Sequence, residues 1–122
     1  MIKDIAFFAY PSTDMARSRN FFEGVLGLVP DADGGFEDPE NKWVEYSFGN
    51  STIGVGQSSE WLPSKDGPTA AFEVDNFDEM LAKVKSAGIT IEQGPHIFPS
   101  CSMFVIRDPD GNKVTIHQRK SA

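Results

Sequence analysis

The sequence contains a single cysteine, Cys101, so no disulfide can form within the chain. It has no apolar run near the length of about 18 residues that a membrane-spanning helix needs. The first residues show no charged and then apolar signal segment, which together with the lone cysteine favours a cytoplasmic protein. Basic residues are few, since 11 Lys and Arg stand against 18 Asp and Glu for a net charge of −7. This balance argues against a nucleic acid or an anionic membrane as partner.

The most informative stretch runs from Arg107 to Gln118. Residues 108–112 predict a tight turn, because proline presets φ, glycine accepts a positive φ, and Asp or Asn can bond its own backbone. After the turn, Thr115 and His117 alternate with apolar neighbours, which predicts a strand with one polar and one apolar face. Residues 103–106 are predicted as the partner strand. Any chemistry of the protein is expected near the polar face of this hairpin.

The same series of elements is predicted twice along the 122 residues, a length sufficient for one α+β domain with a core. The first half begins with a buried strand at 2–10, ended by Pro11, and a helix that is capped by Ser12 or Thr13 and ended by Gly27. A loop or short irregular strand at 31–41 and strands at 42–48 and 52–57 follow. The second contains a strand at 69–74, a helix at 77–87 capped by Asp75 and ended by Gly88, a loop at 93–99, and the final hairpin. The halves align at a constant offset of 61, which pairs Ile53 with Val114 and Gln57 with Gln118. A duplicated strand-helix-strand-strand-strand unit explains this offset. We expect module one at 1–57, a linker at 58–67 and module two at 68–119, with two sheets side by side, helices outside and a cleft between them.

Two motifs add a family resemblance. The turn Asp108-Pro109-Asp110-Gly111-Asn112 with its alternating strand resembles the last hairpin of the vicinal oxygen chelate superfamily. The segment 19–28, Arg-Asn-Phe-Phe-Glu-Gly-Val-Leu-Gly-Leu, resembles the first helix of that group, which includes glyoxalase I, bleomycin-resistance proteins and extradiol dioxygenases. The resemblance implies one glyoxalase-like domain over 1–122, built from two βαβββ modules. It also implies a homodimer, in which modules can swap between chains.

The enzymes of this superfamily hold a divalent metal through His, Glu or Gln side chains on the first and last strands of each module. By resemblance, the corresponding positions in this chain are Phe7 or Phe8, Gly54, Pro68 or Thr69, and Thr115. Phenylalanine and glycine offer no ligand atom on the side chain, and threonine rarely binds such metals alone. The sequence therefore predicts no metal at the usual site and no cofactor.

The remaining candidates describe an apolar pocket with a few polar groups, which is typical of small-molecule sites. Alternation places Trp43 and Glu45 on the face away from the helix, and the offset pairs them with Phe104 and Ile106. The predicted ligand-binding set is Phe8, Trp43, Glu45, Phe104, Thr115 and His117, with Glu45 and His117 as candidate acid and base. Each also has an ordinary interpretation: His117 as a surface residue, Glu45 as a solvated carboxylate, and Trp43 and Phe104 as packing.

Three minor features complete the set of candidates. Cys101 could act as a nucleophile near His117, but the strand register places it near residue 120, which favours an inert thiol. His96 lies in a predicted Gly-Pro loop and is expected to be exposed. A displaced metal site made of His96, Cys101, Glu45 and His117 is a further alternative, although its spacing matches no standard site.

The preferred hypothesis is a glyoxalase/bleomycin-resistance-like protein that binds a small molecule in an apolar cleft without the standard metal. The alternative is a lyase- or dioxygenase-type enzyme of the same superfamily with a displaced metal site. A protein-interaction subunit is a third possibility, which only the acidic surface supports.

Overall fold

The computed structural model describes residues 1–120, and its contacts divide the chain into two units, Met1–Pro63 and Ser64–Ala122. The division lies within residues 58–67, the segment expected to connect the modules. Each unit is a βαβββ module, so the predicted α+β fold with an internal repeat is confirmed. No helix in the described part of the chain has the length and apolarity needed to cross a membrane.

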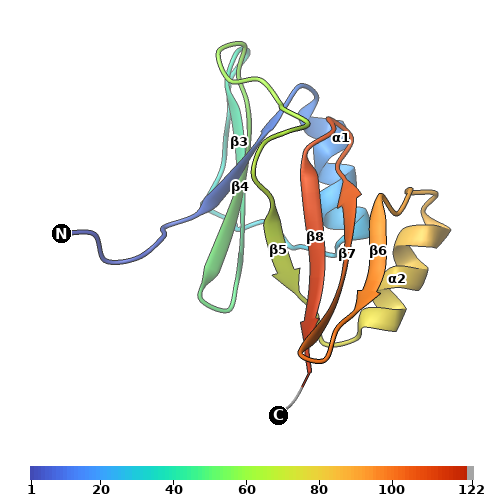
Figure 1. Cartoon of the computed structure of the whole chain (residues 1–122). Coiled ribbons are helices and arrows are strands. Elements are labelled where there is room, and N and C mark those ends of the chain that lie inside the picture. Colours follow the sequence, from blue (N-terminus) through green and yellow to red (C-terminus); the bar gives the residue numbers. More distant parts are fainter. Residues whose placement is uncertain (121–122) are drawn as a thin grey trace. The chain divides into compact units, whose positions relative to one another are not determined.

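The first module contains four strands and one helical segment (Figure 1). Its elements are β1 Phe8–Ser12, α1 Met15–Arg19, a π-helix Asn20–Val25, β2 Phe36–Glu37, β3 Lys42–Phe48 and β4 Ser51–Gln57. The sheet order is β1-β4-β3-β2, with β1 parallel to β4 and the other pairs antiparallel. The helical segment packs against the sheet through the side chain of Phe22, which is fully buried and contacts the rings of Tyr10 and Tyr46.

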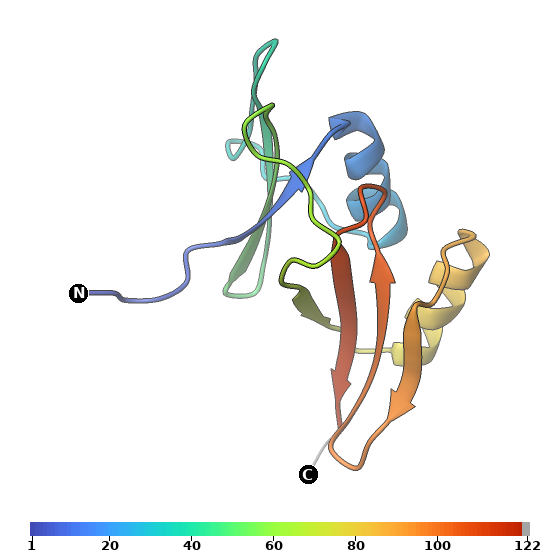
Figure 2. The same cartoon turned by 45° about the horizontal axis from the view of Figure 1, so that its top comes forward.

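The second module repeats this topology (Figure 2). Its elements are β5 Ala70–Glu73, α2 Phe77–Ser86, β6 Gln93–Ile97, β7 Cys101–Arg107 and β8 Lys113–Arg119. The sheet order is β5-β8-β7-β6, with β5 parallel to β8. Phe77 of α2 packs against Phe104 of β7 at 5.4 Å between ring centroids, so α2 covers the face of the sheet that carries Phe104.

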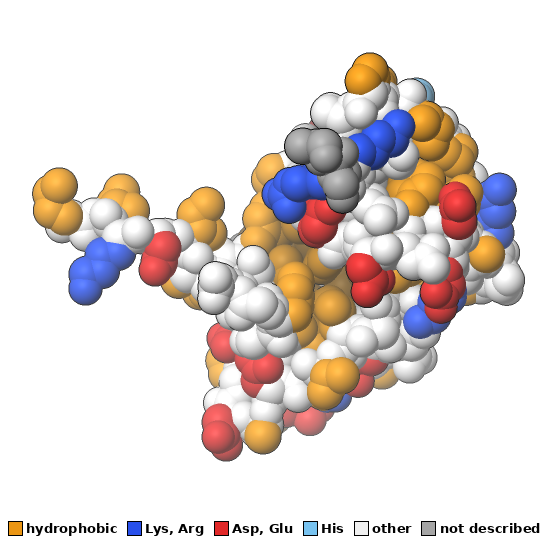
Figure 3. Space-filling model, turned by 90° about the horizontal axis from the view of Figure 1, so that it is seen from below, with side chains coloured by type: hydrophobic (Ala, Val, Ile, Leu, Met, Phe, Trp, Pro, Cys, Tyr) orange, Lys and Arg blue, Asp and Glu red, His pale blue; other side chains and the backbone are white. Residues whose placement is uncertain are grey.

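The first strand is shorter than predicted. It begins at Phe8 and continues through Pro11, which we expected to end it. The proline is accepted because β1 is an edge strand, where one backbone face needs no ladder partner. The first residues, 1–5, extend away from the sheet, and their apolar side chains are exposed (Figure 3), with Ile2 at 96% and Ile5 at 85%.

The helix caps also differ from the prediction. Asp14 caps α1 by accepting a hydrogen bond from the Arg17 amide, and Asn76 caps α2 by accepting one from the Glu79 amide. Ser12 instead accepts from the amide of Asp14. Sequence alone could not choose among adjacent residues, because several of them have side chains able to cap. The helix-ending glycines were predicted correctly, since Gly27 and Gly88 both adopt φ near +76°.

The segment predicted as a loop at 93–99 contains strand β6. Gly94 and Pro95 suggested a loop, but β6 is an edge strand and its ladder with β7 is irregular between Gln93 and His96. An edge position with an irregular register tolerates both residues, because fewer of their backbone groups need partners.

Each module uses one glutamine to connect its last strand to its helix. The side-chain oxygen of Gln57 accepts a hydrogen bond from the Met15 amide at 2.8 Å, and that of Gln118 accepts one from the Phe77 amide at 2.8 Å. These two residues are among the pairs that the offset of 61 matched. The repeat is therefore present in specific hydrogen bonds as well as in topology.

Candidate functional site

Each sheet has one face covered by its helix and a second face that no helix of its own module covers. We call the second the helix-free face. In the first module, Tyr46 is fully buried against Phe22 and donates a hydrogen bond to Glu23, so it lies on the helix side. Trp43 and Glu45 therefore lie on the helix-free face, as alternation predicted.

The ring of Trp43 lies flat on two glycines of β4. A Cβ atom added to Gly54 would be 2.2 Å from Cζ2 of Trp43, and one added to Gly56 would be 2.9 Å from Cε3. Both distances are far below van der Waals contact, so only glycine leaves room for the indole. Opposite strand positions confirm the placement, because Trp43 pairs with Gly56 and Glu45 with Gly54.

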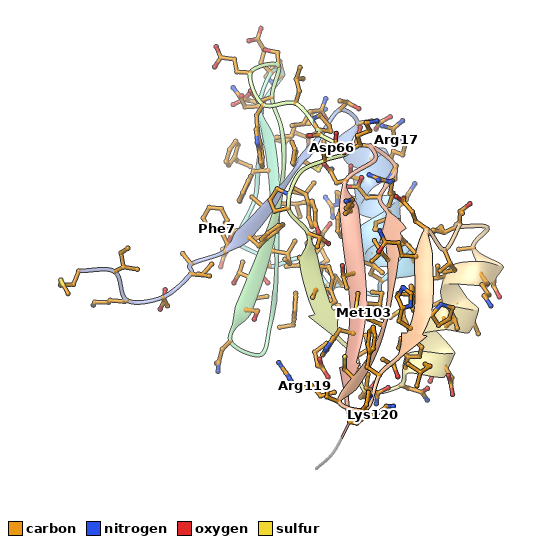
Figure 4. The ribbon with its side chains drawn as sticks, viewed as in Figure 1. Phe7, Arg17, Asp66, Met103, Arg119 and Lys120 are labelled. Carbon is orange, nitrogen blue, oxygen red and sulfur yellow. The ribbon has the colours of Figure 1, made fainter. Side chains whose placement is uncertain are left out.

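Two further aromatic rings extend this surface. Phe7 (labelled in Figure 4) meets Trp43 edge-on, with ring centroids 5.4 Å apart and planes at 74°. Trp61 also lies close to Gly56, since its Cζ3 is 2.9 Å from the position that a Cβ on Gly56 would occupy. We call Phe7, Trp43 and Trp61 the aromatic platform. Sequence analysis overlooked Trp61, because it lies in the segment assigned to the linker.

Glu45 supports the platform from the side. Its Oε2 accepts a hydrogen bond of 2.7 Å from the indole Nε1 of Trp43, which fixes the rotation of the ring. The bond satisfies the one polar group of the indole, as a partly buried tryptophan requires. Glu45 is therefore a positioning residue for Trp43.

Phe8 is not part of this surface. It contacts Tyr10 at 5.1 Å between ring centroids, and Tyr10 packs on Phe22 of the helical segment. Phe8 thus lies on the helix side, and its assignment to the ligand-binding face was wrong. The neighbouring Phe7 occupies the helix-free face instead, because successive side chains of an extended chain point to opposite faces.

Phe104 is also on the helix side, contrary to the prediction. It is fully buried against Phe77 and lies opposite Ile116. The constant offset of 61 misled here, because the turn after β7 has one more residue than the turn after β3. Gly49 and Asn50 form the first turn, whereas the backbone bond from the Asp108 amide to the Asn112 carbonyl encloses three residues. One extra residue moves the structural equivalent of Trp43 from Phe104 to Met103.

The helix-free face of the second module carries Thr115 and His117, as predicted. Opposite them on β7 lie Val105 and Met103, and opposite them on β5 lie Ala71 and Glu73. His117 Nδ1 is 2.6 Å from Oε1 of Glu73. Each predicted catalytic candidate therefore has its hydrogen bond within its own module, Glu45 with Trp43 and His117 with Glu73.

Glu73 is held in place by more than one donor. Its Oε2 accepts a 2.6 Å hydrogen bond from the Arg119 amide, and the Arg119 guanidinium lies 3.8 Å from Oε1. The backbone bond from Arg119 is the largest cause of a lowered pKa of the Glu73 carboxyl; burial opposes it, and the bond with His117 lowers the pKa further. Glu73 is therefore an ionised acceptor beside His117. Sequence reasoning did not find this residue, which is separated from His117 by 44 positions.

Cys101 and His96 do not join these groups into a metal site. Cys101 pairs with Arg119 at the far end of β8, as the register predicted, and His96 lies on β6 with its ring beside Phe98. Within residues 1–120, no three His, Cys, Asp or Glu side chains come close enough together to hold a metal ion.

The positions that carry metal ligands in related enzymes can now be tested for fit. In the first module they hold Phe7 or Phe8 and Gly54, and the space above Gly54 is filled by Trp43. In the second module the Thr69 and Thr115 hydroxyls lie 3.1 Å apart. A phenylalanine, a glycine and two hydroxyls do not supply the imidazole or carboxylate ligands of such a metal. The residues at these positions therefore do not fit the divalent metal ion that the related enzymes bind.

A hollow of about 420 Å³ lies elsewhere in the first module, beside the ends of β1 and β4. Its lining includes Ser12, Gln57 and Ser58 together with the apolar Leu62. The Gln57 side-chain oxygen is already bonded to the Met15 amide. The hollow contains none of the predicted site residues, so the aromatic platform is the better candidate for a binding site.

Residues 4–116 match the family model of the Glyoxalase/Bleomycin resistance protein/Dioxygenase superfamily. The chain belongs to this superfamily. The family assignment made from the two motifs is thus confirmed, and this glyoxalase-superfamily chain has the expected two modules. No curated protein matches it in sequence.

Several solved structures share this fold with the chain at low sequence identity. TnmS3, an antibiotic binding protein from Streptomyces sp. CB03234, is 18% identical, with a TM-score of 0.80 over 98% of both chains. A glyoxalase/dioxygenase from Nostoc punctiforme is 19% identical, with a TM-score of 0.79 over 98% of this chain and 92% of that one. The fosfomycin resistance protein FosX from Listeria monocytogenes is 14% identical, with a TM-score of 0.78 over 98% and 94%. At these identities the similarity supports the fold alone, and the function has to be inferred from the residues of the site.

Proposed function

We propose that this protein binds a planar aromatic small molecule on the aromatic platform of its first module, without a transition metal. The observation that carries the proposal is the ring of Trp43 laid flat on Gly54 and Gly56, with Phe7 and Trp61 beside it. Aromatic faces bind flat apolar ligands by stacking, and Trp and Tyr dominate such contacts. The hydrogen bond to Glu45 should strengthen binding further, because an indole ring that is already held in place loses little conformational entropy when a ligand binds.

The charge of the protein indicates which aromatic ligands it would accept. The chain has a net charge of −7, and Glu45 lies at the edge of the platform. A cationic aromatic molecule would be attracted over this surface and could make a cation–π contact with the indole. An anionic aromatic molecule of the same size would be repelled.

A fluorescence titration with the cationic dye proflavine tests the proposal. The variant Trp61→Phe leaves Trp43 as the sole tryptophan, so quenching of its emission reports binding at the platform. We expect saturable quenching that EDTA leaves unchanged. Measured through the emission of proflavine itself, which needs no tryptophan, the affinity should fall about tenfold in Trp43→Ala, as for loss of one stacking contact. Phe48→Ala is the matched control, because Phe48 is an aromatic residue at the opposite end of the same strand.

Binding that Trp43→Ala leaves unchanged, or that EDTA abolishes, would refute this proposal. An enzymatic alternative, a lyase or dioxygenase with a displaced metal, requires that purified protein contain a stoichiometric transition metal, which elemental analysis measures directly. We also propose a cytoplasmic homodimer, as the family resemblance implies. Size-exclusion chromatography with light scattering would show a single species of twice the chain mass if this is right.

A further inference from the structure

The second module carries polar groups that the aromatic platform does not use. Glu73, His117, Thr69 and Thr115 lie together on the helix-free face of β5 and β8. Thr115 is 5% exposed, and the His117 side chain is 26% exposed. The directions of their hydrogen atoms follow from the contacts that surround them.

The Glu73 carboxylate determines the tautomer of His117. An ionised carboxylate can only accept, so the 2.6 Å contact with Nδ1 requires that Nδ1 carry the hydrogen. In the neutral imidazole, Nε2 then has no hydrogen and presents a lone pair. Two further contacts from Arg119 hold the Glu73 carboxylate in the position where it accepts from His117 Nδ1.

The threonine pair has a direction as well. Thr69 Oγ1 lies 3.0 Å from the Lys113 carbonyl and 3.1 Å from the Ala70 carbonyl, and carbonyl oxygens can only accept. The single hydroxyl hydrogen of Thr69 is therefore used for these carbonyls. We infer that Thr115 is the donor in the 3.1 Å contact between the two hydroxyls, because this direction gives the hydrogen of each hydroxyl an acceptor. The remaining lone pair of Thr115 Oγ1 is then available as an acceptor.

We propose that the helix-free face of the second module is a binding site for a ligand with O–H or N–H donors, in which His117 Nε2 is the main acceptor and Thr115 Oγ1 the second. Glu73 is the positioning residue that holds His117 in the accepting tautomer. The two acceptors are two residues apart on one strand, which places their backbone positions about 6–7 Å from each other. On the neighbouring strand β7, the apolar residues Val105 and Met103 lie opposite Thr115 and His117, and their side chains suit the ring of a phenol. This site does not depend on the aromatic platform.

The tautomer is tested first, by two-dimensional ¹⁵N–¹H NMR of the histidine rings. The chain has two histidines, so His96 is an internal control in the same spectrum. We expect His117 to be in the Nδ1–H form and to lose this preference in Glu73→Ala. Glu73→Gln, whose amide oxygen can still accept, should retain part of it. A wild-type protein with His117 in the Nε2–H form would overturn the assignment.

Ligand selection is tested with phenol, which is neutral at pH 7, and its methyl ether anisole, which has the same ring but no O–H donor. We expect phenol to shift the His117 Nε2 resonance, and anisole to bind at least about fivefold more weakly, as for one lost hydrogen bond. His117→Leu should remove this difference. Equal affinities for the two compounds, or no shift of His117 up to the solubility limit of phenol, would overturn the proposal. Neither readout uses proflavine or Trp43, so the two proposals succeed or fail separately.

Discussion

The replacement Gly54→Ala is the most direct test of the surface that we assign to ligand binding. Gly54 is buried, and its φ lies outside the left-handed range that disfavours alanine, so the backbone itself accepts the change. The added Cβ would lie 2.2 Å from Cζ2 and 2.4 Å from Cη2 of Trp43. Relief of these contacts requires that the indole move by more than about 1 Å, because carbon atoms in contact stay near 3.5 Å apart.

Two consequences follow from this displacement. Overpacking at a filled site costs typically about 1–3 kcal/mol, so the free energy of unfolding should fall by that amount. The Trp43 Nε1 to Glu45 Oε2 bond, now 2.7 Å, should be lost, because the ring can no longer lie in its present plane. Proflavine affinity should decrease with it.

The assay is urea unfolding followed by far-UV circular dichroism, with Trp43 emission measured separately in the Trp61→Phe background. Gly24→Ala is the matched control, since nothing lies within 4 Å of a Cβ at Gly24. A double-mutant cycle with Trp43→Val isolates the clash, because Gly54→Ala should cost much less once the indole is gone. If Gly54→Ala left both stability and Trp43 emission as in the wild type, the placement of the indole over β4 would be incorrect.

The other predictions concern stability. Tyr46→Phe should lower the free energy of unfolding by about 1–2 kcal/mol in urea titrations, because it removes the 2.8 Å bond to Glu23. Burial raises the pKa of Glu23, but the hydrogen bonds it accepts outweigh this and hold it below the ordinary value of 4.5. The stabilisation from Glu23 is therefore present above that value and lost as pH falls through the lowered pKa of Glu23, and Glu23→Gln should lose less stability than the wild type over the same fall in pH. Asn76→Ala should cost about 1 kcal/mol through loss of the α2 cap, whereas Asp75→Ala, at the position predicted from sequence, should cost clearly less. Equal costs at the two positions would contradict the cap assignment.

The sequence alone predicted the repeat and most of the strands. Its signals were local: the turn residues at 108–112, the helix-ending Gly27 and Gly88, and the alternation in β3 and β8. Such signals depend on the residues beside them in the chain, so one sequence is enough to interpret them. The same locality explains the errors, since caps of equal quality stood side by side and an edge strand with Gly94 and Pro95 resembled a loop.

The faces and partners of the site residues were decided by tertiary structure. One extra residue in the turn after β7 turned Phe104 toward α2 and brought Met103 to the helix-free face, because side chains in a strand alternate with a period of two. The pairing of Glu73 with His117 and the approach of Trp61 to Gly56 join residues that lie far apart or in irregular segments. The sequence by itself determined the fold family and the duplicated module. Which aromatic rings and which hydrogen-bond acceptors share a surface depended on strand register, which the whole sheet sets.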